Sequence, residues 1–133
     1  MVLNQATDYA LRITLFLAKQ KNGDAIDAFT IYSAEAIPKR FLFKIMITLV
    51  KAGIVKSVRG RNGGFMLGRN SEDIALYDII EAVEGPIALK HCLMDADKCN
   101  KNATEYCNMH KKLAVLREEL VYKFQNINMR MLM

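Results

Sequence analysis

The 133-residue sequence lacks three features that would place it in common functional classes. No apolar run approaches the roughly 18 residues of a membrane-spanning helix. A signal-peptide layout is also absent, because Asp8 and Arg12 precede the short apolar run 13–18. The sequence has no nucleophile–base constellation, no paired catalytic carboxylates and no phosphate-binding motif, which argues against an enzyme. We therefore expect a cytoplasmic protein that does not act at a membrane.

Carboxylates are missing from the middle third of the chain. Between Glu35 and Glu72 there is no acidic residue, whereas the same stretch carries eight bases, which are Lys39, Arg40, Lys44, Lys51, Lys56, Arg59, Arg61 and Arg69. Solvated faces of proteins usually mix both signs of charge. A one-sided stretch of this length indicates a polyanionic partner, and double-stranded DNA is the natural one.

Cysteine is scarce and odd in number. The three cysteines are Cys92, Cys99 and Cys107, and His110 follows the last of them. Three cysteines cannot form a closed set of disulfides, and a cytoplasmic chain is not expected to keep one. From the residues alone, metal binding, redox chemistry and simple burial all remain open for them.

Helical periodicity dominates the first part of the chain. Apolar spacing predicts a helix over about 5–20 that begins after Asn4, and Asp27 is a suitable N-cap for a second, shorter helix to about residue 36. Pro38 breaks the pattern and suits the first turn of a third helix over about 38–52. The apolar side of this third helix is formed by Leu42, Ile45, Met46 and Leu49, and Gly53 follows its end.

The stretch from Arg59 to Arg69 predicts a β-hairpin. Apolar residues flank it on both sides, and Asn62-Gly63 favours a tight turn because both residues tolerate positive φ. Taken alone, Asn62-Gly63 is more typical of an ordinary solvated turn. A tip of glycine and arginine, however, suits close approach to a phosphate backbone, and the basic segment before it favours that function.

Helix, helix, basic helix and basic hairpin together predict a winged helix-turn-helix, a mainly α fold with a small β-hairpin wing. In this fold the second helix of the pair enters the DNA major groove, so we expect Arg40 and Lys44 to contact base edges. Phosphate contacts are assigned to Lys39, Arg59 and Arg61. Phe43 could touch a thymine methyl group, but we expect it to belong to the core.

The C-terminal half is expected to contain three further parts. A short helix over about 74–83 stops at Gly85-Pro86, and 86–106 has little periodicity, which is typical of a functional or disordered loop. A helical stripe then returns from Cys107 onward, formed by Leu113, Leu116, Leu120, Phe124, Ile127 and Met131. Too little chain remains to cover this stripe, which favours homodimerisation, although packing against the first helix is an alternative and both can hold.

These patterns give the predicted organisation. Residues 1–85 form the winged helix-turn-helix DNA-binding domain, 86–106 form a cysteine-bearing sensor loop, and 107–133 form a long C-terminal dimerisation helix.

The motifs, in this order, resemble the winged-helix regulators typified by IscR and NsrR. The resemblance is carried by Thr7-Asp8-Tyr9-Ala10-Leu11-Arg12, by residues 37–45 and 49–55, by Arg59-Gly60-Arg61-Asn62-Gly63-Gly64-Phe65-Met66-Leu67, and by residues 79–85. It implies a homodimeric bacterial transcription factor, usually a repressor, with a long C-terminal helix that crosses its partner. It also implies that Arg40, Phe43 and Lys44 face bases of a DNA operator, and that the wing tip is Gly60, Arg61, Asn62, Gly63 and Gly64.

The same resemblance implies an iron–sulfur cluster held by Cys92, Cys99 and Cys107. Thiolates suit iron because they are soft, charged donors. The fourth ligand is either His110, as in the IscR-type [2Fe–2S] proteins, or Asp8 of the partner subunit, as in the NsrR-type [4Fe–4S] proteins. The spacings between the cysteines are longer than in the well-known sensors. We favour [4Fe–4S] over [2Fe–2S].

Other interpretations of these residues stay open. Asp8 and Arg12 are spaced as an ordinary i,i+4 ion pair, and His110 alone could be a solvated residue. A zinc site of three cysteines and one histidine is less favoured, because structural zinc sites usually include a closely spaced cysteine pair. A metal-free thiol switch needs only two close cysteines. Some relatives of this fold lack a cluster and respond to a protein partner.

Overall fold

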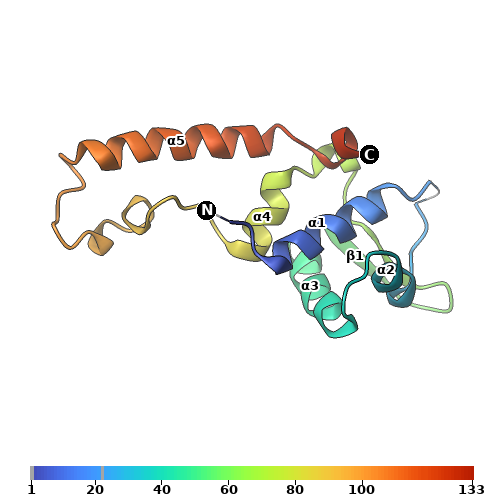
Figure 1. Ribbon diagram of the computed structural model, residues 1–133. Coiled ribbons are helices and arrows are strands. Elements are labelled where there is room, and N and C mark those ends of the chain that lie inside the picture. Colours follow the sequence, from blue (N-terminus) through green and yellow to red (C-terminus); the bar gives the residue numbers. More distant parts are fainter. Residues whose placement is uncertain (1, 22) are drawn as a thin grey trace.

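The computed structural model describes residues 2–21 and 23–133, and these ranges form five α-helices, one two-stranded hairpin and four short 3-10 turns (Figure 1). The elements are α1 (Gln5–Ala18), α2 (Ala28–Ala34), α3 (Lys39–Lys51), β1 (Val55–Val58), β2 (Gly64–Leu67), α4 (Leu76–Glu84) and α5 (Asn108–Gln125). The predicted mainly helical winged helix-turn-helix with a long C-terminal helix is confirmed. Among the helices described, none is long and apolar enough to cross a membrane.

The helices begin and end where local chemistry satisfies their free backbone groups. The side-chain oxygen Oδ1 of Asn4 accepts a hydrogen bond from the Thr7 N–H at 2.9 Å, and Oδ1 of Asp27 accepts one from the Thr30 N–H at 2.9 Å. Both predicted N-caps are therefore confirmed. After α3, Gly53 adopts φ +73°, a left-handed conformation that glycine reaches without steric cost.

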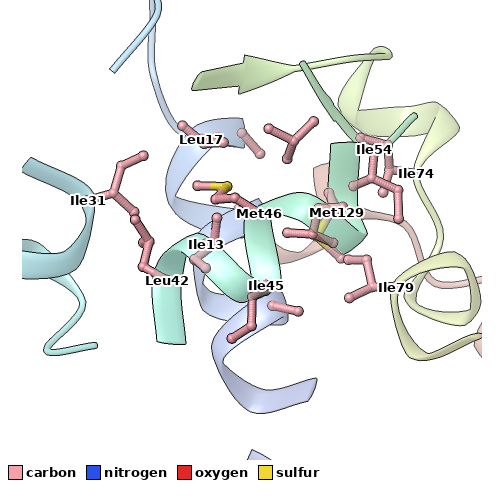
Figure 2. Close-up of a cluster of buried hydrophobic side chains, with 14 of the residues drawn as sticks. Ile13, Leu17, Ile31, Leu42, Ile45, Met46, Ile54, Ile74, Ile79 and Met129 are labelled. Atoms are coloured by element: carbon pink, nitrogen blue, oxygen red, sulfur yellow. The ribbon is translucent and has the colours of Figure 1, made fainter. Parts of the chain in front are cut away.

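One apolar core joins α1, α3, α4 and the hairpin. The inner face of α3 is buried as predicted, and Ile13 of α1 and Ile79 of α4 are fully buried in the same cluster. Figure 2 shows these side chains meeting between the helices, with Met129 from the end of the chain among them. The core thus fixes α3 on one side and leaves its other side to solvent.

The hairpin forms as predicted, but its turn differs from the prediction. Val55 pairs with Leu67 and Val58 pairs with Gly64, so five residues connect the strands. Within this connection the Gly63 N–H donates to the Gly60 carbonyl at 3.0 Å. Positive φ occurs at Gly60 and Gly64, and not at the Asn62-Gly63 pair, so the tight turn spans residues 60–63 and is not centred on Asn62-Gly63 as expected.

A contact from outside the hairpin explains this geometry. The N–H and carbonyl of Ile26 exchange hydrogen bonds with those of Phe65, both at 2.8 Å, so a third segment runs beside β2. A Cβ atom on Gly64 would lie 2.3 Å from the Ile26 carbonyl oxygen. Gly64 is needed for this close approach.

The C-terminal helix is shorter than the apolar stripe predicts. It ends at Gln125, and the amide of Asn126 caps it by donating to the Tyr122 carbonyl at 2.7 Å. The remaining residues return to the winged-helix part, where the Met129 N–H donates to the Ile74 carbonyl at 2.9 Å. Met129 is fully buried in the core. The body of α5 packs on α4, and Figure 1 shows it extending away from the hairpin.

Candidate nucleic-acid interface and cysteine site

The outer face of α3 carries the residues predicted to contact DNA. Lys39, Arg40 and Lys44 are all exposed on it. The Arg40 guanidinium carbon lies 5.0 Å from the centroid of the Phe41 ring, a cation–π distance that limits the freedom of this side chain. Phe41 in turn lies 6.2 Å from Tyr9 of α1, measured between ring centroids. The core of the domain thereby supports the first turn of α3.

Phe43 is on the surface, contrary to the expectation that it belongs to the core. Its side chain is 42% exposed and lies outside the buried cluster. The reason is its place on α3, because Leu42 and Met46 already fill the inner side and Phe43 points away from them. The position leaves Phe43 beside Lys44 on the solvent-facing side.

The first turn of α3 carries positive charges, whereas helices usually favour negative charges at their N-terminal end. Its first turn has two bases, Lys39 and Arg40, and no acid, and Pro38 at the N-cap makes no side-chain capping bond. Cations near a helix N-terminus are unfavourable because the helix dipole is positive there, typically by about 0.3–1 kcal/mol each. Such an arrangement favours a ligand that brings its own negative charge, and phosphate is well suited to this site.

The wing presents the second set of predicted contacts. Arg59, Gly60, Arg61 and Asn62 are exposed at its tip. Gly63 is half-buried, and a Cβ there would lie 2.4 Å from the Val58 carbonyl oxygen, so its glycine is required by the backbone of the turn. Gly63 and Gly64 thus have structural roles, and their contact with DNA stays a prediction.

Arg69 differs from the other bases of the acid-free stretch because it is paired with an acid of the protein itself. Its guanidinium lies 3.9 Å from the Asp78 carboxylate and donates to the Asp73 carbonyl at 3.3 Å, at the far end of β2 from the tip. Within the described ranges, the other seven bases of the stretch form no ion pair. Their charges are consequently available to a partner, whereas the charge of Arg69 is partly satisfied by the protein.

The three cysteines and His110 line one small cavity of about 100 Å³ at the N-terminal end of α5. The buried Cys92 lies in the 3-10 turn His91–Leu93, and its Sγ is 3.4 Å from Nδ1 of His110. Cys107 is the N-cap of α5, and its Sγ accepts from the His110 N–H at 3.4 Å. Cys99 follows the 3-10 turn Ala96–Lys98.

The cavity is not a finished metal site. Among the residues the structure describes, no three cysteine, histidine or acidic side chains converge on one metal-binding point. The thiols are all free. Backbone amides of Ala103 and Lys101 lower the pKa of the Cys99 thiol, and Lys90 contributes a smaller lowering through its charge. A lowered pKa favours the thiolate of Cys99, the form that binds metals and reacts with oxidants.

Asp8 is held within its own chain. Its carboxylate forms a 2.5 Å ion pair with Arg12 and accepts from the Gln5 amide at 3.1 Å. Arg12 also donates to the Glu35 carbonyl at 3.3 Å, just before the turn that leads into α3. Both side chains of the ion pair are more than two-fifths exposed, so the pair itself adds little stability. The ordinary i,i+4 interpretation of Asp8 therefore holds for a single chain.

The comparison with protein families decides what kind of protein this is. The family model described as Rrf2, iron-dependent transcriptional regulator, matches residues 3–133. The chain belongs to the Rrf2 family. It is therefore a DNA-binding transcriptional regulator and not an enzyme, as the sequence predicts.

Relatives of this Rrf2 protein include a putative HTH-type transcriptional regulator, rrf2-like, of Rhodobacter capsulatus. It is 35% identical over an alignment of 121 residues that covers 85% of this chain and 79% of the relative. NsrR of Bacillus subtilis, an HTH-type transcriptional regulator, is 35% identical over 98 residues, covering 74% of this chain and 66% of NsrR. Among solved structures, CymR, the global cysteine regulator of B. subtilis, has a TM-score of 0.81 at 25% identity, covering 99% of this chain and 95% of CymR. IscR of T. potens has a TM-score of 0.77 at 20% identity, with 99% and 85% covered, a likeness of fold alone.

Several residues of the two candidate sites were not predicted from the sequence. Lys90, Lys98 and Met109 line the cysteine cavity, and Ile47 is exposed on the outer face of α3. A signal for Ile47 was present, since it follows Arg40 by seven residues and Lys44 by three, which places it on their face. For Lys90 no comparable signal exists, because the loop lacks periodicity.

Proposed function

We propose that this protein is a cytoplasmic homodimeric repressor whose operator binding is controlled by an iron–sulfur cluster held by Cys92, Cys99 and Cys107. The observation that carries the proposal is the shared cavity at the base of α5, which these three thiols and His110 all line. Thiolates and imidazole are the donors that iron accepts in proteins. Lys90 and Lys98 beside them offset the negative charge that a thiolate-bound cluster carries.

The DNA-binding half of the proposal assigns base contacts to Arg40, Phe43 and Lys44 and phosphate contacts to Lys39 and the wing residues 59–64. Exposure of these side chains, the absence of neighbouring acids and the cationic first turn of α3 support it. With α3 in the major groove, the wing tip can rest on the adjacent backbone.

Replacing Lys44 tests this assignment. Lys44→Ala should weaken binding to a selected operator duplex by about 1–3 kcal/mol, or about 5–150-fold, if the ammonium reads a base edge. Fluorescence anisotropy on operator and random duplexes at one salt concentration measures both effects. Lys21→Ala, an exposed lysine outside the acid-free stretch, is the matched control. An equal loss on random DNA would make Lys44 a phosphate contact instead.

Homodimerisation through α5 is supported by its uncovered apolar side. No residue of α5 is fully buried, and Val115, Leu116 and Tyr122 are more than half exposed. A second copy that covers this side places two α3 helices on one molecule, which matches two half-sites in an operator.

Control by the cluster follows from the connections of Asp8. We assign the fourth ligand to Asp8 of the partner subunit, in a [4Fe–4S] cluster, with His110 in a [2Fe–2S] cluster as the alternative. Asp8 would then leave its ion pair with Arg12, which also donates to the Glu35 carbonyl ahead of α3. The ligand state at one protomer's cavity thereby changes the support of its partner's α3. Coupling of about 1–3 kcal/mol is typical of such links and changes affinity about 5–150-fold.

The positions of the three cysteines bear on how the chain would bind a cluster. Cys92, Cys99 and Cys107 would hold a cluster only with their sulfur atoms closer to one point than they are in this structure. When bound, the cluster supplies iron that is sensitive to oxidants and nitric oxide. The chain contributes the thiolates, the compensating lysines and the link from Asp8 to α3.

Anaerobic purification tests the sensing half. We expect a coloured protein with iron and sulfide in equal amounts, and an absorption spectrum that separates [4Fe–4S] from [2Fe–2S]. Cys99→Ser should remove colour and effector response while far-ultraviolet circular dichroism stays unchanged. Asp8→Asn and His110→Gln form a matched pair, since only the variant that lacks the true fourth ligand should lose cluster stability. A colourless native protein, or a response kept by Cys99→Ser, contradicts the proposal.

A cluster-free regulator controlled by a protein partner or by thiol oxidation is the second candidate. It is favoured by the separated sulfur atoms and by the similarity in fold to CymR. In this case the anaerobic protein contains no iron, and its DNA binding responds to peroxide or to an added partner protein. Zinc analysis of the same preparation distinguishes a zinc site from both.

A further inference from the structure

The outer face of α3 alternates positive and apolar side chains. Arg40, Phe43, Lys44, Ile47 and Lys51 follow one another at steps that keep them on one side of a helix. Ile47 is 60% exposed, the most of any large apolar residue on α3. Its exposure is unexplained by the fold, because the core is complete on the opposite side.

Next to Ile47 the surface is hollowed into an apolar groove of about 340 Å³ between α3 and the hairpin. Phe43, Ile47 and Val50 of α3 form one wall, Ser57 and Phe65 of the hairpin form the other, and Lys51 lies at its edge. Only the serine and the lysine in this set are polar. The groove thus offers contact to an apolar group, and it lies between the two elements assigned to DNA.

The charges around the groove select what can occupy it. The stretch that builds it, residues 36–71, has no carboxylate, and Lys44 and Lys51 form no ion pair among the described residues. The occupant should therefore be anionic and should carry small apolar groups. The major groove of DNA has both properties, because its phosphates are negative and the 5-methyl group of thymine is the apolar group on its base edges.

We propose that the groove between α3 and the hairpin receives thymine methyl groups, with Ile47 as the main contact and Phe43 beside it. Each operator half-site then requires thymine at the one or two positions that face Ile47. This inference rests on the proposed binding of α3 in the major groove and adds which bases it selects. Arg40 and Lys44 supply polar contacts on either side, so one helix face reads guanine edges and thymine methyls together.

The test removes the methyl group and nothing else. Operator duplexes selected from a random library are resynthesised with deoxyuridine in place of thymine, one position at a time. Wild-type protein should bind about three- to fourfold more weakly for each methyl that the groove buries, at one or two positions in each half-site. With Ile47→Ala, thymine and deoxyuridine should bind alike at those positions.

Two controls separate this contact from general effects. Lys44→Ala should weaken binding yet keep the ratio between thymine and deoxyuridine at the positions that face Ile47. Val2→Ala removes an apolar side chain that is also exposed, at 88%, and lies outside α3 and α5, so it should leave affinity and ratio unchanged. The measurement on wild-type protein needs no variant and stands even if a variant folds poorly.

The possible failures are distinguishable. If the protein selects a sequence but no deoxyuridine changes its affinity, the thymine contact is overturned while DNA binding by α3 stands. That outcome leaves the groove to an acidic, amphipathic segment of another protein, which the same charges would accept. If no sequence is selected at all, the proposed operator binding fails and this inference fails with it.

Discussion

Helices α3 and α5 both expose apolar side chains, but they differ in what holds them. Four residues of α3 are fully buried against α1, α4 and the hairpin, whereas no residue of α5 is buried to that degree. The exposed apolar side chains of α3 are therefore not needed to hold the helix in place, because its buried side already does so. The exposed apolar side of α5 is the surface that we assign to the proposed homodimer. Similar exposure thus indicates recognition in one helix and assembly in the other.

The largest expected effect is a loss of folding stability, which we expect for a truncation in α3 and not for one in α5. Leu42→Ala on α3 should lower the free energy of unfolding by about 2–5 kcal/mol, because it leaves a cavity in a core that is fully closed. Leu116→Ala on α5 removes a side chain that is 52% exposed and should have a much smaller effect within one chain. Urea denaturation at several protein concentrations measures both. Equal losses of unfolding free energy for the two variants would contradict the view that α3 is held by the core of its own chain and α5 is not.

A second prediction concerns self-association. Leu116→Asp places a charge in the uncovered side of α5 and should weaken the dimer at least about tenfold, which corresponds to about 1.4 kcal/mol. Sedimentation velocity over a dilution series measures the dissociation constant. Glu118→Asp, on the same helix and already charged, is the control. A dimer that tolerates Leu116→Asp unchanged would show that α5 is covered in some other way.

The smallest effect tests the support that α3 receives from α2. Thr30 hydrogen bonds, first from its hydroxyl and then from its backbone, lower the pKa of the Asp27 carboxyl below its ordinary value of 3.8. An acid whose pKa is lower in the folded state stabilises it above the ordinary pKa, and this contribution is lost as pH falls through the folded pKa. Asp27→Asn keeps a capping oxygen but cannot ionise.

The pH dependence of that variant is the measurement. The stability difference between wild type and Asp27→Asn should favour wild type near neutral pH and shrink toward about pH 3. Thermal unfolding in matched buffers detects the change. A difference that stays constant over this range would mean that ionisation of Asp27 does not contribute to capping α2.

Local signals predicted most of the winged-helix part correctly. Asn4, Asp27 and Gly53 act through neighbours only a few residues away, so their roles could be inferred from the sequence. The same holds for the buried stripe of α3. Strand β2 of the wing was different, because Gly64 and Phe65 lie against Ile26, a residue far from them in the sequence. The sequence of the hairpin does not predict that contact.

The errors at Phe43 and at the end of α5 have a related cause. Periodicity identifies an apolar side chain, but it does not say whether the core has room for it. Leu42 and Met46 occupy the place that Phe43 was expected to take. Likewise the stripe continues beyond Gln125 in the sequence, but the helix ends there because the following segment returns to the winged-helix core, where Met129 is buried. In the cysteine loop, spacing identified the donors, and their approach to one another depends on folding of the loop.

The place of Met129 in the core means that a residue from the segment after α5 completes the hydrophobic interior of the winged-helix part. A chain that stops at Gln125 would contain every helix, yet it would have a hole between α1 and Ile74 where the thioether now sits. The interior of the winged-helix part is therefore incomplete until the segment after α5 has folded back onto it. Proteolytic trimming of a few residues after α5 should consequently disable DNA binding from a distance, without touching the residues that contact the duplex.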